Sequence, residues 1–228
     1  MIQKPIISAA EAAAKVKPGD TVLVAGFLAC GSPIAIIRAL AATDTGGLTL
    51  VCNDTATYDL KTGTITGVAH LVAGKRCKRI ITSHIGLNQE AQRQMNEGET
   101  RIDLIPQGTL VEQIRAGGAG LGGILTPTGI GTEVEQGKQV ITIEGRPYLL
   151  ELPLRGNVAL IKASVADKAG NLIYSATARN FNPIMATAAD LVIAEADEIF
   201  EIGALDPDAI HTPSIYVDFL VRAEGQDA

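Results

Sequence analysis

Short, mostly apolar runs recur along the first half of the chain, and segments with helical spacing separate them. The runs occupy residues 21–25, 48–52, 79–82 and 102–105, and the helical segments occupy residues 8–15, 34–42, 88–96 and 109–116. The runs are continuously apolar rather than alternating, which is typical of strands buried on both faces of a parallel sheet. This alternation of strand and helix predicts an α/β fold with an open, mainly parallel sheet flanked by helices.

Two Ser/Thr-x-x-Glu patterns mark predicted helix starts. In such a capping box, the hydroxyl of the first residue accepts a hydrogen bond from the backbone of the fourth, whose carboxylate bonds back. Ser8 and Glu11 fit this pattern, and Thr109 and Glu112 fit it again. We therefore expect one helix to open at Ser8 and another to open at Thr109.

The second half of the chain has a different pattern. Residues 140–143 and 148–152, joined by residues 144–147, predict an antiparallel hairpin. Further buried strands are predicted at residues 157–163 and 191–194.

The last predicted helix begins at an Asn-Pro pair. Asn182 is a good N-cap and Pro183 suits the first turn, so we expect a helix to residue 189. No internal repeat, heptad pattern or linker interrupts the chain. We therefore predict one domain over residues 1–228, with the hairpin as an excursion from it.

Composition and charge narrow the class of protein. The chain has 228 residues, 46% of them hydrophobic, and a formal net charge of −6. An acidic chain of this kind is not expected to bind nucleic acid. No apolar run approaches the roughly 18 residues of a membrane span, and the N-terminus does not look like a signal peptide, so no membrane partner is expected. Cys30, Cys52 and Cys77 are widely spaced, which is typical of reduced thiols in a cytoplasmic protein.

A glycine-rich tract follows the helix predicted at residues 109–116. Residues 118–123 match G-x-G-x-x-G, but a dinucleotide fingerprint needs a strand before it and a helix after it. Here a helix precedes the motif, and residues 124–127 cannot start a regular helix, so nucleotide binding is disfavoured. A tightly turned loop remains open, as does a loop that moves over a site or fits against a partner chain.

Residues 26–33 have a better context for binding a ligand. They lie between a predicted strand and a predicted helix, at the edge of a parallel sheet where ligands usually bind. Free amides at the helix start would favour a phosphate, although no G-K-[ST] follows and the segment is not a P-loop. A ligand-binding loop and a purely structural turn both remain open.

Metal and hydrolase chemistry have little support in the sequence. His70, His84 and His211 lie far apart without metal-ligand spacing, so no metal site is predicted. There is no G-x-S-x-G motif. Cys30 lies near a predicted helix start, where the pKa of a thiol can fall, but packing is the more common role of a lone cysteine.

Two clusters of charged residues are also expected to be structural. The basic residues at 75–79 surround Cys77, and the acidic residues at 195–201 follow a predicted strand. Either cluster could serve a site, as a phosphate contact or a carboxylate. Solvated strand ends are the default interpretation of both.

The segment at residues 22–33 resembles the alpha-subunit signature of the family I coenzyme A transferases. That signature is an apolar triplet, Gly-Gly-Phe, three residues, Gly, any residue and Pro, and here it reads Val-Leu-Val-Ala-Gly-Phe and then Gly-Ser-Pro. Ala25 replaces the first glycine, and Pro18 stands where Asp or Asn is usual. Other family-like segments are residues 53–55, 83–86, 106–110, 115–120, 126–132, 178–183, 206–207 and 211–213. The chain is most similar to the alpha subunits of acetate/acetoacetate and butyrate–acetoacetate CoA-transferases.

The resemblance implies a CoA-transferase and sugar-phosphate-isomerase-like fold, and a heteromeric enzyme that moves CoA between a short-chain acyl-CoA and a carboxylic acid. Acetate, butyrate and acetoacetate are the implied acids, with CoA as a substrate and no cofactor. In this family a glutamate forms a glutamyl-CoA intermediate. That glutamate belongs to the beta subunit, within Ser-Glu-Asn-Gly, and no Glu-Asn pair occurs here. We therefore expect the chain to need a beta subunit that carries the catalytic Glu and to be inactive alone.

The resemblance also assigns candidate site residues. Gln107, in Pro-Gln-Gly-Thr, is the candidate contact for the oxyanion or acyl carbonyl, with capping of the turn before the Thr109 helix as the alternative. Gly26, Phe27 and Gly31 are expected near the substrate or CoA. A small-ligand-binding or regulatory protein on the same fold is the alternative function.

Overall fold

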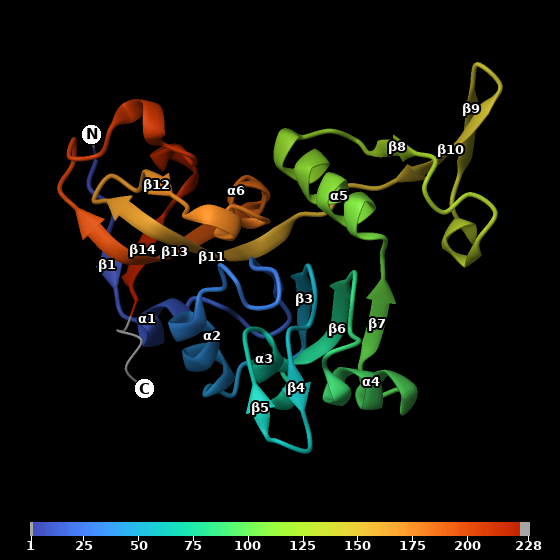
Figure 1. Ribbon diagram of the computed structural model, residues 1–228, viewed down its shortest axis with the longest axis horizontal. Helices are drawn as coiled ribbons and strands as arrows, with labels where there is room; N and C mark the ends of the chain where they lie inside the picture. Colours follow the sequence, from blue (N-terminus) through green and yellow to red (C-terminus); the bar gives the residue numbers. More distant parts are fainter. Residues whose placement is uncertain (1, 224–228) are drawn as a thin grey trace.

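One large sheet forms the centre of the computed structural model, which describes residues 2–223. Its nine strands in these residues are β1 (Ile6–Ile7), β2 (Thr21–Val24), β3 (Leu48–Cys52), β6 (Cys77–Thr82), β7 (Arg101–Leu104), β11 (Gly156–Asp167), β12 (Leu172–Ile173), β13 (Ala189–Phe200) and β14 (Phe219–Arg222). Eight follow the order β1-β14-β13-β11-β2-β3-β6-β7, and every neighbouring pair is parallel (Figure 1). The short β12 pairs antiparallel with β11. The predicted open, mainly parallel sheet is confirmed.

Helices cover both faces of this sheet. They are α1 (Ala9–Ala13), α2 (Ile34–Ala41), α3 (Ala69–Ala73), α4 (Gln89–Asn96), α5 (Gln107–Ala119) and α6 (Asn182–Met185). Val22 and Val24 of β2 pack with α1, α2 and α3 on one face, whereas Leu23 packs with α5 and α6 on the other. Figure 1 shows these two layers below and above the sheet. Burial on both faces explains why the strands are continuously apolar. None of the helices in residues 2–223 has the length and hydrophobicity that crossing a bilayer requires.

Two small sheets lie outside the central one. β4 (Tyr58–Asp59) pairs with β5 (Thr64–Ile65), and β10 (Arg146–Glu151) lies between β8 (Ile124–Thr126) and β9 (Val140–Ile143). Glu144 and Gly145 connect β9 to β10 with φ of 50° and 76°, the left-handed values of a two-residue hairpin turn. The predicted hairpin is confirmed, and Figure 1 shows it projecting from the body of the molecule beyond α5.

Helix α5 differs from its prediction at both ends. It begins at Gln107 after the N-cap Pro106, so Thr109 does not form a capping box, and it continues to Ala119 instead of ending near residue 116. Glycines that seemed to end the helix are instead required for close packing. A Cβ on Gly117 would lie 2.0 Å from the Leu154 carbonyl oxygen.

Helix α6 is shorter than predicted. It ends at Met185 instead of residue 189, and its N-cap is Phe181, not Asn182. The side chain of Asn182 is directed away from its own helix, because it bonds to the loop that follows β2. The predicted strand at residues 191–194 is the centre of the longer β13.

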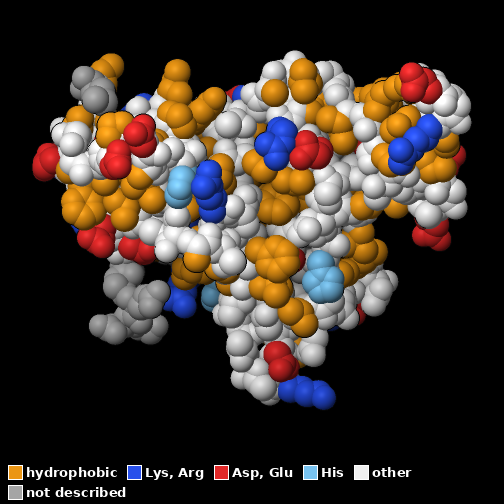
Figure 2. All heavy atoms as spheres, turned by 45° about the horizontal axis from the view of Figure 1, so that its top comes forward, with side chains coloured by type: hydrophobic (Ala, Val, Ile, Leu, Met, Phe, Trp, Pro, Cys, Tyr) orange, Lys and Arg blue, Asp and Glu red, His pale blue; other side chains and the backbone are white. Residues whose placement is uncertain are grey.

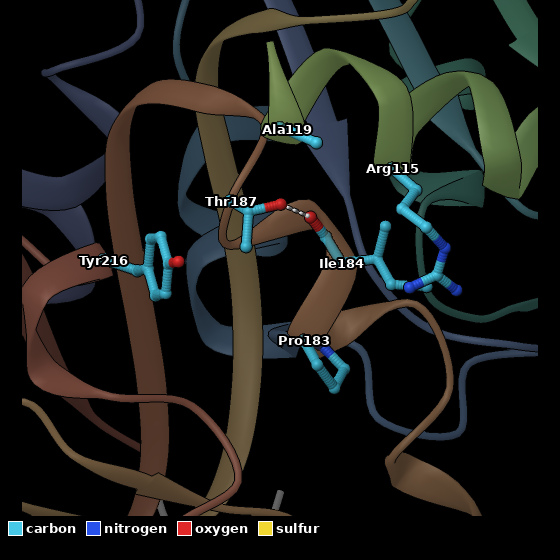
Figure 3. A pocket seen from close by; sticks show the side chains of 7 residues that line it. Arg115, Ala119, Pro183, Ile184, Thr187 and Tyr216 are labelled. Atoms are coloured by element: carbon cyan, nitrogen blue, oxygen red, sulfur yellow. Dashed lines mark hydrogen bonds between the residues drawn. The ribbon is translucent and has the colours of Figure 1, made fainter. Parts of the chain in front are cut away.

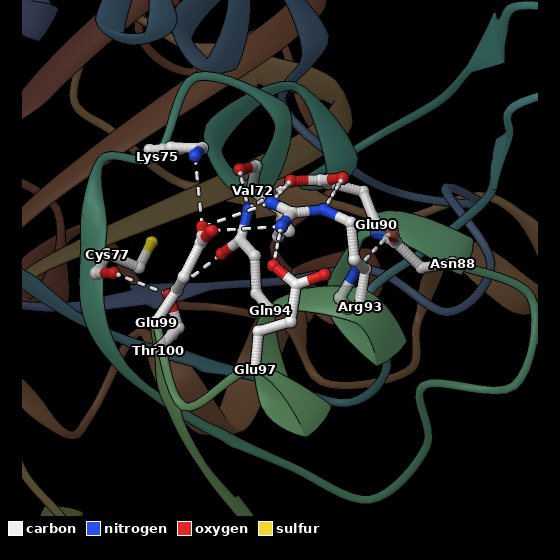
Figure 4. A network of polar contacts seen from close by, with 11 residues as sticks. Val72, Lys75, Cys77, Asn88, Glu90, Arg93, Gln94, Glu97, Glu99 and Thr100 are labelled. Atoms are coloured by element: carbon white, nitrogen blue, oxygen red, sulfur yellow. Dashed lines mark hydrogen bonds and ion pairs between the residues drawn. The ribbon is translucent and has the colours of Figure 1, made fainter.

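A cluster of polar side chains, here called the α4 network, joins α4 to its neighbours (Figure 4). Arg93 donates hydrogen bonds to Glu90, Glu97 and Glu99. The buried Gln94 donates to the Val72 carbonyl and to Glu90, and it accepts a hydrogen bond from Thr100. Lys75 pairs with Glu99, so this part of the basic cluster at residues 75–79 is neutralised within the fold. The α4 network therefore holds α4 to α3 and to the segment that leads into β7.

Candidate functional site

The carboxyl ends of β2, β3, β6 and β7 meet at one edge of the sheet, because these strands are parallel neighbours. Residues 25–33, 53–57, 83–88 and 105–106 leave the sheet there. The order of connections reverses between β2 and β11, which defines the position where open α/β sheets usually bind ligands. Figure 2 shows several separate patches of hydrophobic side chains on this side of the molecule, with charged side chains between some of them.

A chain of hydrogen bonds crosses this edge, and we call it the carboxyl-edge network. Asp54, which is buried, accepts bonds from the Leu28 N–H at 2.9 Å and the Ala56 N–H at 2.8 Å. It also accepts a bond from Asn53 Nδ2 at 2.7 Å. Asn53 Oδ1 in turn accepts a bond from Gln107 Nε2 at 2.7 Å. The loop after β2 is thus tied, through the end of β3, to the start of α5.

The loop after β2 has a strained backbone. Leu28 and Ala29 have φ of 46° and 68°, the left-handed region that costs a non-glycine residue about 1–3 kcal/mol. Reciprocal backbone hydrogen bonds between Phe27 and Cys30, with N···O distances of 3.0 and 2.9 Å, close the loop. Phe27 and Leu28 are exposed, at 43% and 45%. Two large hydrophobic side chains are therefore presented to the exterior at the site.

The glycines of the signature are required by this backbone. Gly26 has φ of 125°, and a Cβ there would lie 2.0 Å from Ser32 Oγ. Gly31 has φ of 75°, and a Cβ there would come within 3.0 Å of Ala178. Ala25, which replaces the first glycine of the signature, is not among the residues with positive φ, so alanine fits without strain.

Gln107 occupies the first position of α5, and its side chain is exposed. Its amide bonds to a side chain 54 residues earlier and does not cap the local turn, so that alternative is wrong. An amide nitrogen has two hydrogens. One is used on Asn53, and the other is available to a group outside the network. Its action on an oxyanion stays a prediction.

Sequence reasoning gave no role to Asn53 or Asp54, although both lie in a family-like segment. The signal that could have found them is the pair of adjacent polar residues directly after a buried strand. Such residues fall on the carboxyl-edge loops that carry function in α/β folds.

Glu195 corrects the expectation of a solvated acidic edge. It is buried, only 3% exposed, and burial raises the pKa of its carboxyl. The opposing contacts are Lys162 Nζ at 3.6 Å and the Ile36 N–H at 3.2 Å. Because Pro33 offers no side-chain cap to α2, Glu195 satisfies the amino end of that helix. Glu195 thereby fixes the point where the loop after β2 ends and α2 begins.

The histidines do not come together. His70 lies in α3, and His211 stacks on Tyr174, with ring centroids 5.9 Å apart. His84 is exposed beside Asp54 at the carboxyl edge. Within residues 2–223, no three His, Cys, Asp or Glu side chains are arranged to hold a metal ion.

The cysteines differ in exposure. Cys30 is exposed, with its Sγ 3.3 Å from Thr177 Oγ1. Cys52 and Cys77 are buried, and burial raises the pKa of both thiols, that of Cys77 to about 12. Neither buried thiol is suited to act as a nucleophile.

Two cavities lie outside the carboxyl-edge network. The larger, about 1220 Å³, is lined by loop residues 29–32 and by Lys162, Glu195 and Asp197. The smaller, about 280 Å³, lies among Arg115, Ile184 and Tyr216 (Figure 3). The Nε of Arg115 pairs with Glu112 in an exposed ion pair at 3.0 Å.

Comparison with known proteins identifies the family of the chain. The family model described as coenzyme A transferase matches residues 6–223. The acetate CoA-transferase subunit alpha of Escherichia coli K12 is 48% identical over 208 residues, which cover 91% of this chain and 92% of the relative. The acetoacetyl-CoA:acetate/butyrate CoA transferase alpha subunit of Clostridium acetobutylicum is 44% identical over 206 residues, covering 90% and 92%. The chain belongs to the coenzyme A transferase family. Within it, the chain is of the alpha-subunit type.

Solved structures share the fold. An acyl-CoA transferase of E. coli O157:H7, crystallised as a thioester complex with CoA, superposes with a TM-score of 0.88 at 21% identity. That alignment covers 99% of this chain, which spans about half of that protein, 48%. Glutaconate CoA-transferase of Acidaminococcus fermentans gives a TM-score of 0.81 at 18% identity, covering 96% of this chain and 75% of that chain. The fold is therefore that of CoA-transferases, as predicted.

Proposed function

We propose that this chain, as one domain over residues 1–228, is half of a CoA-transferase that exchanges CoA between a short-chain acyl-CoA and acetate, butyrate or acetoacetate. Residue 1 and residues 224–228 of that span lie outside the described residues. The observation that carries the proposal is the carboxyl-edge network, which ends in the exposed amide of Gln107. The named substrates of the E. coli and Clostridium relatives support the choice of acids.

The nucleophile is proposed to come from the beta subunit. Asp54, the carboxylate of the carboxyl-edge network, is buried and accepts three hydrogen bonds, so it is not free to attack a thioester. A glutamate of the partner supplies that attack. Exposed Phe27, Leu28 and Leu87 leave the same edge apolar, as expected of a surface that a partner covers.

The proposed reaction has two halves. The partner's glutamate carboxylate attacks the thioester carbonyl, the C–S bond breaks, and an acyl-glutamyl anhydride and CoA thiolate form. The thiolate then attacks the glutamyl carbonyl, which releases the acid and leaves a glutamyl-CoA thioester. The acceptor acid reverses both steps.

Gln107 is proposed to stabilise the oxyanion that each attack creates. The bond to Asn53 fixes the amide, and its second N–H remains for the oxyanion. A donor held in place before the reaction stabilises developing charge without reorganisation. Gly26, Phe27 and Gly31 shape the loop beside the substrate or CoA.

CoA enters this reaction as a substrate, and we propose no resident cofactor. A cytoplasmic location is proposed because Cys30, Cys52 and Cys77 are unpaired thiols. The preferred acid depends on the fit of one or two methylenes, a difference of about 1–3 kcal/mol each.

The test is co-expression with a partner whose sequence contains Ser-Glu-Asn-Gly. The purified complex is expected to transfer CoA from acetoacetyl-CoA to acetate or butyrate, with ping-pong kinetics, whereas the chain alone is inactive. Transfer by the chain alone would refute the subunit assignment. A complex that binds these acids but transfers nothing would favour the small-ligand-binding alternative.

A further inference from the structure

Residues 178–183 form one of the family-like segments, and no step of the proposed reaction uses them. Asn182, within this segment, is fully buried at 0% exposure. Its Nδ2 donates to the Gly31 carbonyl at 3.0 Å and to the Ala178 carbonyl at 2.8 Å. Its Oδ1 accepts the Lys162 N–H at 2.8 Å. Every hydrogen of the amide is used, and two different parts of the fold depend on it.

The position of Asn182 follows from where β2 leaves the sheet. The last β2–β11 pair is Val24 with Leu160, and the Ala25 N–H still donates to the Leu160 carbonyl. β13 pairs with the other edge of β11 along its whole length, so the next strand on the β2 side is the short β12, which pairs only with Val165 and Ala166. Between Leu160 and Val165, no strand among the described residues lies on the β2 side of β11. The next N–H on that side, that of Lys162, bonds to Asn182 Oδ1. One side chain thus fills the place of the departed strand and contacts the loop into which that strand continues.

Asn180 contacts the same loop one residue earlier. Its Nδ2 donates to the Cys30 carbonyl at 3.0 Å and to the Thr177 carbonyl at 2.8 Å. The two backbones are close, because a Cβ on Gly31 would lie 3.0 Å from the Ala178 carbonyl oxygen. The loop is therefore held from both sides, by Asp54 on the β3 side and by these two asparagines on the α6 side.

We infer that Asn182, assisted by Asn180, is a positioning residue for CoA transfer, which sets the shape of the loop at residues 26–32. Strained conformations such as those of Leu28 and Ala29 persist only where the surroundings fix them. The two carbonyl contacts of the asparagines supply that constraint on the side opposite Asp54. The inference rests on the proposed function to the extent that this loop borders the reacting groups.

Two substitutions separate the two roles of the Asn182 amide. Asn182→Asp keeps an oxygen that can accept the Lys162 N–H, but it cannot donate to Gly31 or Ala178. Asn182→Ala loses both roles. If the contact with the loop matters, both variants of the assembled complex lose roughly 100-fold in kcat/KM, the order expected for a misplacement of about 1 Å. If Asn182 only completes the edge of β11, the Asp variant is still destabilised, because its buried carboxylate faces two carbonyl oxygens, but the complex keeps the wild-type kcat/KM well below its Tm.

Amide hydrogen exchange of the peptide covering residues 26–32 gives a readout that needs no activity. Both variants are expected to exchange faster there. Wild-type exchange in the Asp variant, or fast exchange with unchanged kcat/KM, overturns the inference. If the wild-type complex transfers no CoA, the proposed function fails, and the exchange result still decides whether Asn182 sets the shape of the loop.

Gln94→Leu is the matched control, because Gln94 is also a buried amide with several bonds but belongs to the α4 network (Figure 4). Its loss is expected to lower Tm while leaving kcat/KM and loop exchange unchanged well below Tm. A Gln94 variant that lost kcat/KM to the same extent as the Asn182 variants would show a general effect of destabilisation and overturn the inference.

Discussion

The carboxyl-edge network and the α4 network both combine carboxylates with side-chain amides, and they differ in how they end. In the α4 network, Arg93 faces three carboxylates, and Lys75 pairs with one of them. Every charge meets an opposite charge. The carboxyl-edge network begins at a strained loop and ends at Gln107, whose amide keeps an N–H for another molecule.

The two networks also differ in the part of the chain they join. Arg93 reaches carboxylates three, four and six residues away. The carboxyl-edge network joins residues 26 and 54 positions apart, brought together only by the parallel sheet. The α4 network also has long-range contacts, such as that of Gln94 with Val72, but it is closed and stabilises the packing of α4. The carboxyl-edge network is open and shapes a site. Substitutions in the first are expected to change stability, and those in the second to change activity.

The largest effect is expected from Gln107→Ala. Removal of one oxyanion donor typically costs about 10²–10³-fold in kcat. Stability is expected to change little, because the side chain is exposed. Steady-state kinetics of the assembled complex measure the first effect and thermal melting the second. Gln136→Ala, an exposed glutamine in the segment before the projecting hairpin, is the control and is expected to be silent. An unchanged kcat in the Gln107 variant would remove this role.

Asp54→Asn comes next and is expected to affect both properties. The substitution replaces one of the two acceptor oxygens with an NH2 group. In either orientation this group faces at least one donor, the Ala56 N–H or the Leu28 N–H with Asn53 Nδ2, so at least one contact becomes repulsive. We expect a loss of roughly 10–100-fold in kcat/KM and of about 1–3 kcal/mol in unfolding free energy. Kinetics and urea unfolding measure these. Asp59→Asn is the control. The new side chain still has an oxygen that can accept the Lys61 N–H in a different loop, so neither kcat/KM nor the free energy of unfolding is expected to change. Full activity in the Asp54 variant would contradict the proposal that Asp54 holds the loop after β2 in its active shape.

Arg93→Ala tests the α4 network. It is expected to lower the stability of the protein without lowering its activity. It leaves Glu90, which is 9% exposed, without its cation. Exposed ion pairs contribute less than buried ones, so a small fall in the free energy of unfolding is expected. Urea unfolding of the variant measures it, and the kcat/KM of the complex is expected to match the wild type. A selective loss of activity would erase the distinction between the networks.

The smallest effect concerns pH. Hydrogen bonds from Arg93 and then Lys75 lower the pKa of Glu99 from 4.5 to about 2. The folded state therefore binds this proton less tightly than the unfolded state. The stabilisation is complete above about pH 4.5 and is lost as the pH falls toward 2. Urea midpoints measured across this window are expected to fall more steeply for the wild type than for Glu99→Gln. Parallel curves would show that the pairing contributes nothing.

The sequence predicted most of the sheet because burial on both faces leaves a simple signature. The runs at residues 48–52 and 21–25 match β3 and β2 to within one residue. Helix ends were less predictable. Thr109 and Glu112 have the spacing of a capping box, but the helix begins at Gln107, and Thr109 is buried within α5.

The site was predicted in part, for a physical reason. Gly26 and Gly31 were assigned through the family signature, and their positive φ shows why the backbone of this loop requires glycine. The roles of Asp54 and Asn182 depend on contacts with residues 26 and 151 positions away. Periodicity and spacing describe neighbours along the chain and carry no information about such contacts.

The order of β2 and β11 in the sheet has a consequence for synthesis of the chain. While the chain emerges from the ribosome, β2, β3, β6 and β7 are available to pair before β11 exists. The loop after β2 then still lacks Asn182, which follows 151 residues after Gly31. Long-range contacts of this kind form slowly. The nascent protein therefore carries an unfinished loop, which includes the exposed Phe27 and Leu28, until most of the chain has been made. During this period a chaperone or the partner subunit would protect the loop from aggregation.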